Sequence, residues 1–236
     1  MSDQKKTALV TGGSKGIGFG VAKTLLKMGY NVGITSRKLQ AAEEAASELS
    51  EFGEVLPLEA DVRSYESQQQ AVEKLVNQFG SLDVLVANAG IGKFGSIEDM
   101  SPDDWNTTID TNLTGVFYSV KASVTELKKT EGYIITISSL AGTNFFAGGA
   151  AYNASKFGLT GFSQAIMLDL RDKGVKVSTI MPGSVATYFN GNEPDDKDAW
   201  KIQIEDIGEL VGDLLKMNPR TLPSKIEVRP SRPPKK

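Results

Sequence analysis

The 236-residue sequence contains neither cysteine nor histidine. Without cysteine the chain has no disulfides, no thiolate nucleophile and no cysteine-ligated metal. Without histidine it has no Ser-His-Asp triad, no histidine-ligated zinc and no imidazole for acid–base catalysis. We therefore expect no metal site, and any proton transfer must use other side chains. The missing disulfides also fit a cytoplasmic protein, which is the location we expect.

Charge and hydropathy exclude further classes of protein. The formal net charge is −3 at pH 7, which gives no electrostatic reason to expect a nucleic-acid partner. No apolar run approaches the roughly 18 residues of a membrane span. Residues 1–6 lead directly into the first apolar segment, which leaves no room for a signal peptide. We expect neither nucleic acid nor a membrane among the partners.

Strand and helix patterns alternate along the chain. Such alternation predicts an α/β fold, a single doubly wound, Rossmann-like parallel sheet with helices on both faces. We expect one domain over residues 1–236, with a short substrate-lid segment at about 188–204 and an irregular tail at 230–236. The predicted strands cover 6–10, 31–35, 54–60, 82–87, 132–137, 175–181 and 225–229. The predicted helices cover 40–52, 64–79, 102–130, 150–172 and 204–217, preceded by one with Ile17, Val21, Leu25 and Leu26 on its inner face.

The first strand runs into a glycine-rich turn, and a helix follows. Strand, glycine turn and helix are the context that a dinucleotide site requires. Glycines allow the tight turn, and free N–H groups at the helix N-terminus favour a pyrophosphate. The spacing Gly12-x-x-x-Gly16-x-Gly18 differs from Gly-x-Gly-x-x-Gly, and no P-loop Gly-Lys-Ser/Thr follows. By itself, the turn is equally compatible with an ordinary loop.

Tyr152 and Lys156 lie four residues apart in a predicted helix, and Ser139 precedes the tyrosine by thirteen residues. Four residues make about one helical turn, so the phenol and the ammonium share a face. A nearby cation favours the phenolate and lowers a pKa that is normally about 10. The phenol then approaches the range of an acid–base catalyst. Tyr-x-x-x-Lys alone is more often an ordinary surface pair, so its neighbours in sequence decide the interpretation.

Together the motifs resemble the classical branch of the short-chain dehydrogenase/reductase family, which includes the 3-oxoacyl-acyl-carrier-protein reductases. The resemblance extends from about residue 5 to about residue 190 and weakens afterwards. Each motif is short, but their joint order and spacing are specific. The matching residues are Thr11, Gly12, Gly16, Gly18, Asn88, Ala89, Gly90, Asn112, Ser139, Tyr152, Lys156, Pro182, Gly183 and Thr187.

The resemblance implies an NADP-dependent enzyme that interconverts a carbonyl and a secondary alcohol by hydride transfer. Tyr152 would transfer the proton, Ser139 would bind the substrate oxygen, and Lys156 would lower the tyrosine pKa and bind the nicotinamide ribose. Asn112 would hold a water that links Lys156 to solvent, or it is a polar residue that bends its helix locally. The alternative function is a non-catalytic nucleotide-binding or sensor protein, which has no need of all four residues.

The residue after the second strand indicates the cofactor. An NAD site usually carries an acid there, whereas this chain has Ser36 and Arg37. A guanidinium pairs with a 2′-phosphate, and Lys15 adds a second cation; otherwise Arg37 and Lys38 are solvated charges at a helix start. With the residues that the resemblance implies, the expected NADP-binding set is Gly12, Ser14, Lys15, Gly16, Ile17, Gly18, Ser36, Arg37, Asp61, Val62, Asn88, Ala89, Gly90, Tyr152, Lys156, Pro182, Gly183, Val185 and Thr187.

Three parts of this set have specific roles in the resemblance. Asp61 would contact the adenine, and the 182–187 segment would hold the carboxamide of the nicotinamide. Asn88 would line the cofactor, although a purely structural role in the central sheet is as compatible with its position. Because Thr11, Asp61, Asn88, Ser139 and Pro182 all follow predicted strands, they are expected to converge on one cleft.

The substrate side is less defined, and we expect a small carbonyl or alcohol without naming it. The 190–198 segment is short and acidic, whereas acyl-carrier-protein reductases present basic residues to their acidic carrier. The C-terminal residues also lack the glycine-rich ending of those reductases. The predicted helices 102–130 and 150–172 resemble those that pair across a twofold axis, so a homodimer or homotetramer is expected. The side chains that either form an apolar wall or pack on the domain are Phe94, Phe145, Phe146, Met181, Tyr188 and Phe189.

Overall fold

A computed structural model describes residues 5–233 of the chain. Seven strands form one sheet in the order β3-β2-β1-β4-β5-β6-β7, and every neighbouring pair is parallel. The chain winds outward from β1 to one edge and then from β4 to the other, so the predicted doubly wound fold is confirmed. The strands are β1 (Thr7–Val10), β2 (Asn31–Ser36), β3 (Val55–Glu59), β4 (Val84–Ala87), β5 (Tyr133–Ile137), β6 (Lys176–Pro182) and β7 (Lys225–Val228).

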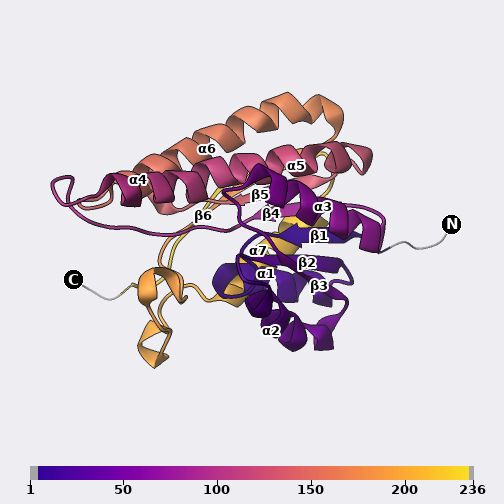
Figure 1. Cartoon of the computed structure of the whole chain (residues 1–236), viewed down its shortest axis with the longest axis horizontal. Helices are drawn as coiled ribbons and strands as arrows, with labels where there is room; N and C mark the ends of the chain where they lie inside the picture. Colours follow the sequence, from indigo (N-terminus) through magenta and orange to yellow (C-terminus); the bar gives the residue numbers. More distant parts are fainter. Residues whose placement is uncertain (1–4, 234–236) are drawn as a thin grey trace.

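Helices cover both faces of this sheet. Figure 1 shows α4, α5 and α6 layered on one side and α1 and α2 on the other, with α7 packed against α1. The helices are α1 (Gly16–Lys27), α2 (Leu39–Leu49), α3 (Tyr65–Phe79), α4 (Pro102–Ile109), α5 (Gly115–Lys129), α6 (Ala150–Leu170) and α7 (Ile204–Lys216). No helix among the described residues is long and apolar enough to cross a membrane.

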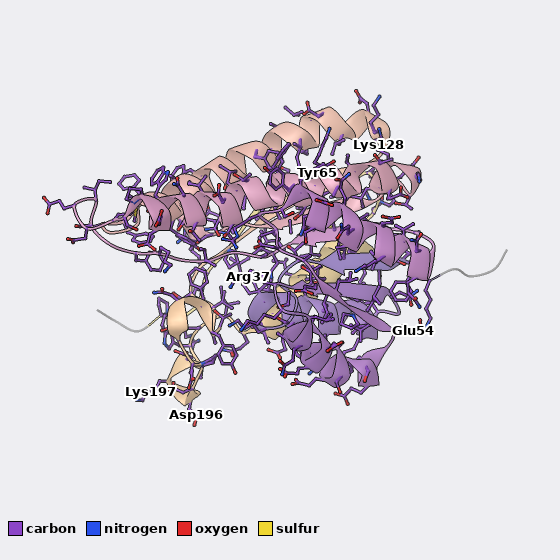
Figure 2. All side chains as sticks on the ribbon, viewed as in Figure 1. Arg37, Glu54, Tyr65, Lys128, Asp196 and Lys197 are labelled. Carbon is purple, nitrogen blue, oxygen red and sulfur yellow. The ribbon has the colours of Figure 1, made fainter. Side chains whose placement is uncertain are left out.

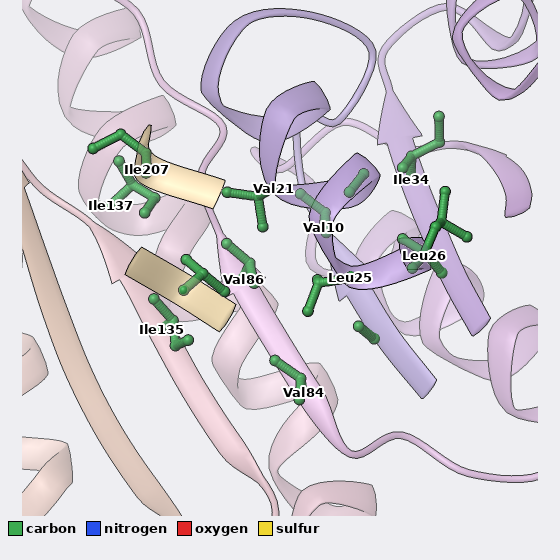
Figure 3. Close-up of a cluster of buried hydrophobic side chains, with 14 of the residues drawn as sticks. Val10, Val21, Leu25, Leu26, Ile34, Val84, Val86, Ile135, Ile137 and Ile207 are labelled. Atoms are coloured by element: carbon green, nitrogen blue, oxygen red, sulfur yellow. The ribbon is translucent and has the colours of Figure 1, made fainter. Parts of the chain in front are cut away.

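The central strands are largely apolar because they contribute side chains to two cores. Val84 and Val86 of β4 belong to the core beneath α1 and α7, whereas Leu85 belongs to the core beneath α3, α5 and α6. Successive side chains of a strand point to opposite faces, which explains this alternation. Figure 3 shows the first core, where Val21 of α1 and Ile207 of α7 lie among the strand residues. The carboxyl ends of the strands are thereby held rigidly in register.

The predicted helical stretch 102–130 is helical from Pro102 to Lys129, but its hydrogen-bond geometry changes partway along it. It begins at Pro102, after Ser101 accepts a hydrogen bond from the backbone of Asp104 at 3.0 Å. It then passes through a π-helical turn, Asp110–Thr114, before α5 begins. Such turns are rare and occur frequently at functional sites. The local distortion that was one of the two interpretations of Asn112 is therefore present.

The chain after β6 leaves the sheet before it returns as α7. The 188–204 segment contains two short 3₁₀ turns, Phe189–Gly191 and Asp196–Asp198. A bridge between Val185 and Ile202 closes its base. Figure 2 labels Asp196 and Lys197 at its outer tip. Residues 230–233, the described part of the predicted tail, are neither helix nor strand, and 234–236 lie outside the described residues, as does most of the N-terminal segment.

Candidate active site

One cleft of about 1040 Å³ lies beyond the carboxyl ends of β1 to β6. Of the five residues that were expected to converge here, Asp61, Asn88, Ser139 and Pro182 line the cleft. Thr11 does not, because its hydroxyl accepts hydrogen bonds from the backbone after β4, and its neighbour Gly12 lines the cleft instead. In doubly wound sheets this edge is the one that binds ligands. Among the predicted cofactor residues, all but Gly18 line the cleft.

The glycine turn is shaped by backbone conformations that glycine adopts at low cost. Gly12 and Gly16 have φ values of +64° and +59°, in the left-handed region. Gly18 does not face the cleft because it packs inward, where an added Cβ would lie 2.5 Å from the Gly12 carbonyl oxygen. Within the described residues, α1 begins without a side-chain cap and without an acid in its first turn. Its first N–H groups are therefore available to an anion.

Asn88 ties the glycine turn to the end of β4. Its side-chain amide donates hydrogen bonds to the carbonyl oxygens of Thr11, at 2.9 Å, and Gly12, at 3.1 Å. Its backbone N–H and that of Ala89 both donate to the Thr11 hydroxyl, at 3.0 and 3.1 Å. Asn88 thus has the structural role that was weighed for it, and it also forms part of the cleft wall.

Two arginines and one carboxylate lie at the β2–β3 end of the cleft. Arg63 holds the Asp61 carboxylate with its Nη2, at 2.6 Å, and with its Nε, 3.1 Å from both oxygens. Hydrogen bonding from Arg63 is the largest cause of a lowered Asp61 pKa, and the charge of Arg37 adds to it. Arg37 is exposed and forms no ion pair within residues 5–233 (Figure 2). It remains available to an anionic group.

Lys156 is almost completely buried, at 5% exposure, and its Nζ donates to the carbonyl oxygen of Ile137 at 3.0 Å. Burial lowers its pKa to about 8. The same Nζ lies 5.8 Å from the centre of the Tyr152 ring. One helical turn therefore places the cation beside the phenol, as the spacing predicts.

Tyr152 differs from the sequence expectation in the direction of its pKa. Burial raises the pKa of the phenol, and hydrogen bonding with Ser139 opposes that shift only in part. The neighbouring cation favours the phenolate and was the only effect visible in the sequence. Removing the phenolate from water costs free energy and raises the pKa instead. Ser139 is itself held in place, because its hydroxyl accepts a bond from the Ala141 N–H at 3.1 Å. Burial at this position therefore favours the protonated phenol.

Asn112 lies behind the wall of the cleft and is fully buried. Its Oδ1 accepts from the Ile91 N–H at 2.8 Å, and its Nδ2 donates to the Ile91 carbonyl at 2.9 Å and to the Ser155 hydroxyl at 3.1 Å. Gly90 separates it from Lys156, since a Cβ there would lie 3.3 Å from Asn112 Oδ1 and 3.7 Å from Lys156 Nζ. Asn112 therefore links the loop after β4 to α6.

Three functional positions were not found from the sequence. Arg63 holds Asp61, Ser155 bonds Asn112, and the Thr35 hydroxyl accepts the Gly12 N–H at 3.3 Å. The Asp-x-Arg spacing directly after a strand was a signal for the first of these. The other two carry no recognisable motif, because they act through contacts between distant elements.

The six candidate side chains of the substrate wall separate into two groups. Phe94, Phe146 and Phe189 form ring contacts around Tyr152. The other three do not join that cluster: Phe145 is 87% exposed, Met181 is fully buried within β6, and Tyr188 lies under Lys15, whose Nζ is 5.9 Å from the ring centre.

Comparison with known proteins places this architecture among oxidoreductases. A family model described as short chain dehydrogenase matches residues 6–198. The chain is 37% identical over 217 residues to trans-4-hydroxycyclohexanecarboxylate dehydrogenase of Sinomonas cyclohexanicum, covering 86% of this chain and 84% of that protein. It is 36% identical over 213 residues to 3-oxoacyl-acyl-carrier-protein reductase of Escherichia coli K12, covering 90% and 86%.

Solved structures are similar over almost the full length. An alcohol dehydrogenase from the archaeon Thermococcus sibiricus, complexed with 5-hydroxy-NADP, superimposes with a TM-score of 0.91 at 30% identity, covering 98% of this chain and 100% of that one. A short chain dehydrogenase from Burkholderia cenocepacia J2315 in complex with NADP gives a TM-score of 0.87 at 30% identity, with coverages of 96% and 97%. The similarity therefore includes the cofactor end and the 188–204 segment alike.

Proposed function

The chain belongs to the short-chain dehydrogenase family, and from this premise we propose that it is an NADP-dependent oxidoreductase that interconverts a carbonyl and a secondary alcohol. One observation carries the proposal. The cleft that is lined by the glycine turn also contains Tyr152 and Lys156, which come from α6, and Ser139, which lies in the turn after β5. A site that only binds a nucleotide has no need of a buried lysine beside a buried phenol.

The residues at the cofactor end fit NADP. The uncapped N-terminus of α1 accommodates a pyrophosphate, and the left-handed glycines leave space for it. Ser36 and the free guanidinium of Arg37 are suited to the 2′-phosphate, with Lys15 as a further cation. The two NADP-complexed relatives have the same fold. When bound, the cofactor supplies or accepts the hydride, and the protein supplies position and the proton.

Tyr152 is the proton donor in the reductive direction. Burial keeps its phenol protonated until a substrate oxygen accepts the proton. Ser139, which shares a hydrogen bond with the phenol, is placed to bond the same oxygen. Lys156, when charged, stabilises the phenolate that remains, because opposite charges in a buried site interact strongly. Asn112 positions α6 against the loop after β4 and so maintains this arrangement.

We extend the proposal to assembly as a homodimer through α5 and α6. These helices expose large apolar side chains, with Phe117 at 44% and Leu168 at 55% exposure. They also form an apolar groove of about 150 Å³, where an isologous contact would bury them. Light scattering at micromolar concentration should then give twice the 25.3 kDa chain mass. A cytoplasmic location and one-domain folding, both expected from the sequence, stay predictions.

A panel of carbonyl compounds with NADPH tests the central proposal. Loss of absorbance of the reduced cofactor, dependent on both protein and ketone, is the expected result. The control is the same panel with NADH at equal concentration. The reaction with NADH should be slower, because NADH lacks the 2′-phosphate that Arg37 is proposed to bind. Tight NADPH binding without turnover of any carbonyl or alcohol would instead support the non-catalytic alternative.

A further inference from the structure

Three phenylalanines on three separate loops form a cluster with Tyr152 at the edge of the cleft, and of the three Phe189 lines the cleft itself. Phe94 follows β4, Phe146 follows β5 and Phe189 follows β6. The Phe94 ring centre lies 5.4 Å from that of Tyr152, and the Phe189 ring centre lies 5.7 Å from it. Phe94 also contacts Phe146 at 5.8 Å and Phe189 at 6.3 Å. The proton donor is therefore one of four rings in a continuous cluster, which we call the aromatic cluster.

Glycines hold these rings close to the backbone. A Cβ on Gly92 would lie 2.6 Å from Phe189 and 2.8 Å from Phe94, and a Cβ on Gly149 would lie 2.6 Å from Phe146. No other residue at these two positions leaves room for the rings where they are. A backbone hydrogen bond from Gly95 N–H to the Gly148 carbonyl, 2.9 Å long, joins two of the three loops. The hydrogen bond therefore fixes the spacing of the loops that carry Phe94 and Phe146, and the two glycines leave room for the rings.

The cluster keeps apolar surface in reach of a ligand. Phe94 is 43% exposed and Phe146 is 48% exposed, although both touch other rings. Apolar surface of this kind is stabilised when a further apolar group covers it. Aromatic rings also add preferred edge-to-face and offset contacts for another ring. A ketone that carries a ring on the carbon chain attached to its carbonyl group can place the ring on these faces. Its carbonyl oxygen then lies at Tyr152.

Charge near the cluster argues against an anionic substrate. Lys93 is paired with Asp104, at 3.3 Å, and Lys201 with Asp198, at 2.6 Å. The remaining cations of the described cleft lie in the glycine turn, after β2 and β3, or, for Lys156, behind Tyr152. An anionic group on the substrate would therefore have to displace Asp104 or Asp198 to reach a cation at this end of the cleft.

We propose that the substrate is an uncharged ketone, or the matching alcohol, that carries an aromatic or alicyclic ring, and that Phe94, Phe146 and Phe189 bind the ring. The inference rests on the proposed oxidoreductase function and adds its substrate class. Carbonyl compounds attached to an acidic carrier protein, or bearing a carboxylate, are excluded as preferred substrates. The ring-binding residues act on affinity, whereas Tyr152 acts on the chemical step.

Three methyl ketones with the same unconjugated carbonyl test the proposal with NADPH. They are methyl 4-(3-oxobutyl)benzoate, which is neutral and has a ring, its free carboxylate, which has the ring and a charge, and 2-butanone, which has neither. We expect kcat/KM for the neutral ring ketone to exceed that of both others at least tenfold. Equal values within twofold, or preference for the carboxylate, would overturn the proposal while leaving the oxidoreductase function intact.

Single substitutions test whether the aromatic cluster binds the ring of the ketone. Phe94→Ala and Phe146→Ala should each raise KM for the neutral ring ketone about fivefold or more, which corresponds to the loss of about one aromatic contact. The increase should be smaller for 2-butanone, because that ketone has no ring to bind. Phe145→Ala is the matched control, because that neighbouring ring is exposed and touches no other ring in the described chain. If Phe145→Ala has the same effect as Phe146→Ala, the cluster does not bind the ring. If no ketone is reduced at all, the oxidoreductase proposal itself fails.

Discussion

The two ends of the cleft are built from different parts of the chain. The glycine-turn part of the cofactor end is made of backbone, with left-handed glycines, free N–H groups of α1 and the closely packed Gly18, and the Arg37 side chain lines its outer part. The substrate end is made of side chains, with a buried lysine, a buried phenol and three phenylalanine rings. Backbone groups are the same in every residue, so the first end suits a ligand common to many enzymes. Side chains differ, so the second end gives this enzyme its individual substrate.

This difference predicts that changes at the two ends have separable effects. Alterations to side chains at the substrate end should change turnover or substrate affinity and leave the cofactor bound. Alterations at the glycine turn should change folding and cofactor affinity. Four experiments test this separation, beginning with the one that has the largest expected effect.

Tyr152→Phe removes the phenolic proton but keeps the ring and its contacts with Phe94 and Phe189. Turnover should fall by about two to four orders of magnitude, the usual contribution of general acid catalysis. NADPH affinity should stay within about threefold, because the phenol is remote from the phosphate end; both are measured on one preparation. Retention of more than about a tenth of the turnover would show that Tyr152 is not the proton donor.

Arg37→Asp places a carboxylate where we expect the 2′-phosphate. NADPH affinity should fall about ten- to a hundredfold, because a charge-assisted hydrogen bond is replaced by repulsion. NADH should then bind better than NADPH. Titration of cofactor fluorescence measures both affinities. Lys38→Asp is the matched control at the neighbouring exposed position, and an equal effect of both variants would mean that only the general charge of this region matters.

Gly18→Ala tests the backbone end directly. The added Cβ would meet the Gly12 carbonyl oxygen and the Asn88 amide, at 2.5 and 2.6 Å, so the free energy of unfolding should fall by about 1–3 kcal/mol. Gly161→Ala on α6 is the opposite case, since nothing lies within 4 Å of its Cβ and the helix gains about 0.5–1 kcal/mol. Urea unfolding measures both. A Gly18→Ala protein as stable as the Gly161→Ala protein would contradict the close packing described for this turn.

Lys156→Met should stabilise the cofactor-free protein at pH 7, by about 1–3 kcal/mol, because a buried charge is removed and an apolar chain of similar length replaces it. The pKa of Lys156 is lowered from 10.5 to about 8. Below pH 8 both the folded and the unfolded lysine are charged, so the cost of burial is complete. As pH rises from 8 to 10.5 the folded lysine loses its proton first, and the wild type gains stability. Urea unfolding at pH 7, 9 and 10 should show the advantage of the variant shrinking; a constant difference would mean that Lys156 is not charged in the folded state at pH 7.

The fold was predictable because its signals are local. Apolar runs such as 82–87 favour buried strands, and their alternation with helical patterns favours a parallel sheet. Helical spacing also placed Tyr152 and Lys156 on one face of a helix, and the family resemblance added Ser139 as their neighbour. The structure brings all three to the cleft, as expected, while their roles stay predictions.

Features that depend on burial and distant contacts were not predictable. The sequence shows a cation near Tyr152 but not the burial that raises its pKa. It shows adjacent phenylalanines at 145 and 146 but not which one joins the cluster, since the loop conformation decides that. The π-helical turn within the 102–130 stretch was equally hidden, because the residues on both sides keep a helical pattern.

The π-helical turn at Asp110–Thr114 has a consequence for redesign of this enzyme. Such a turn is equivalent to one residue inserted into a regular helix. Deleting that residue would restore uninterrupted helical hydrogen bonds and would satisfy any criterion of ideal geometry. It would also rotate everything beyond it by about 100°, so either Asn112 would leave Ile91 and Ser155 or α5 would turn away from its neighbours. Making this helix regular would therefore disturb the packing around the candidate active site. The π-helical turn should be kept in any redesign.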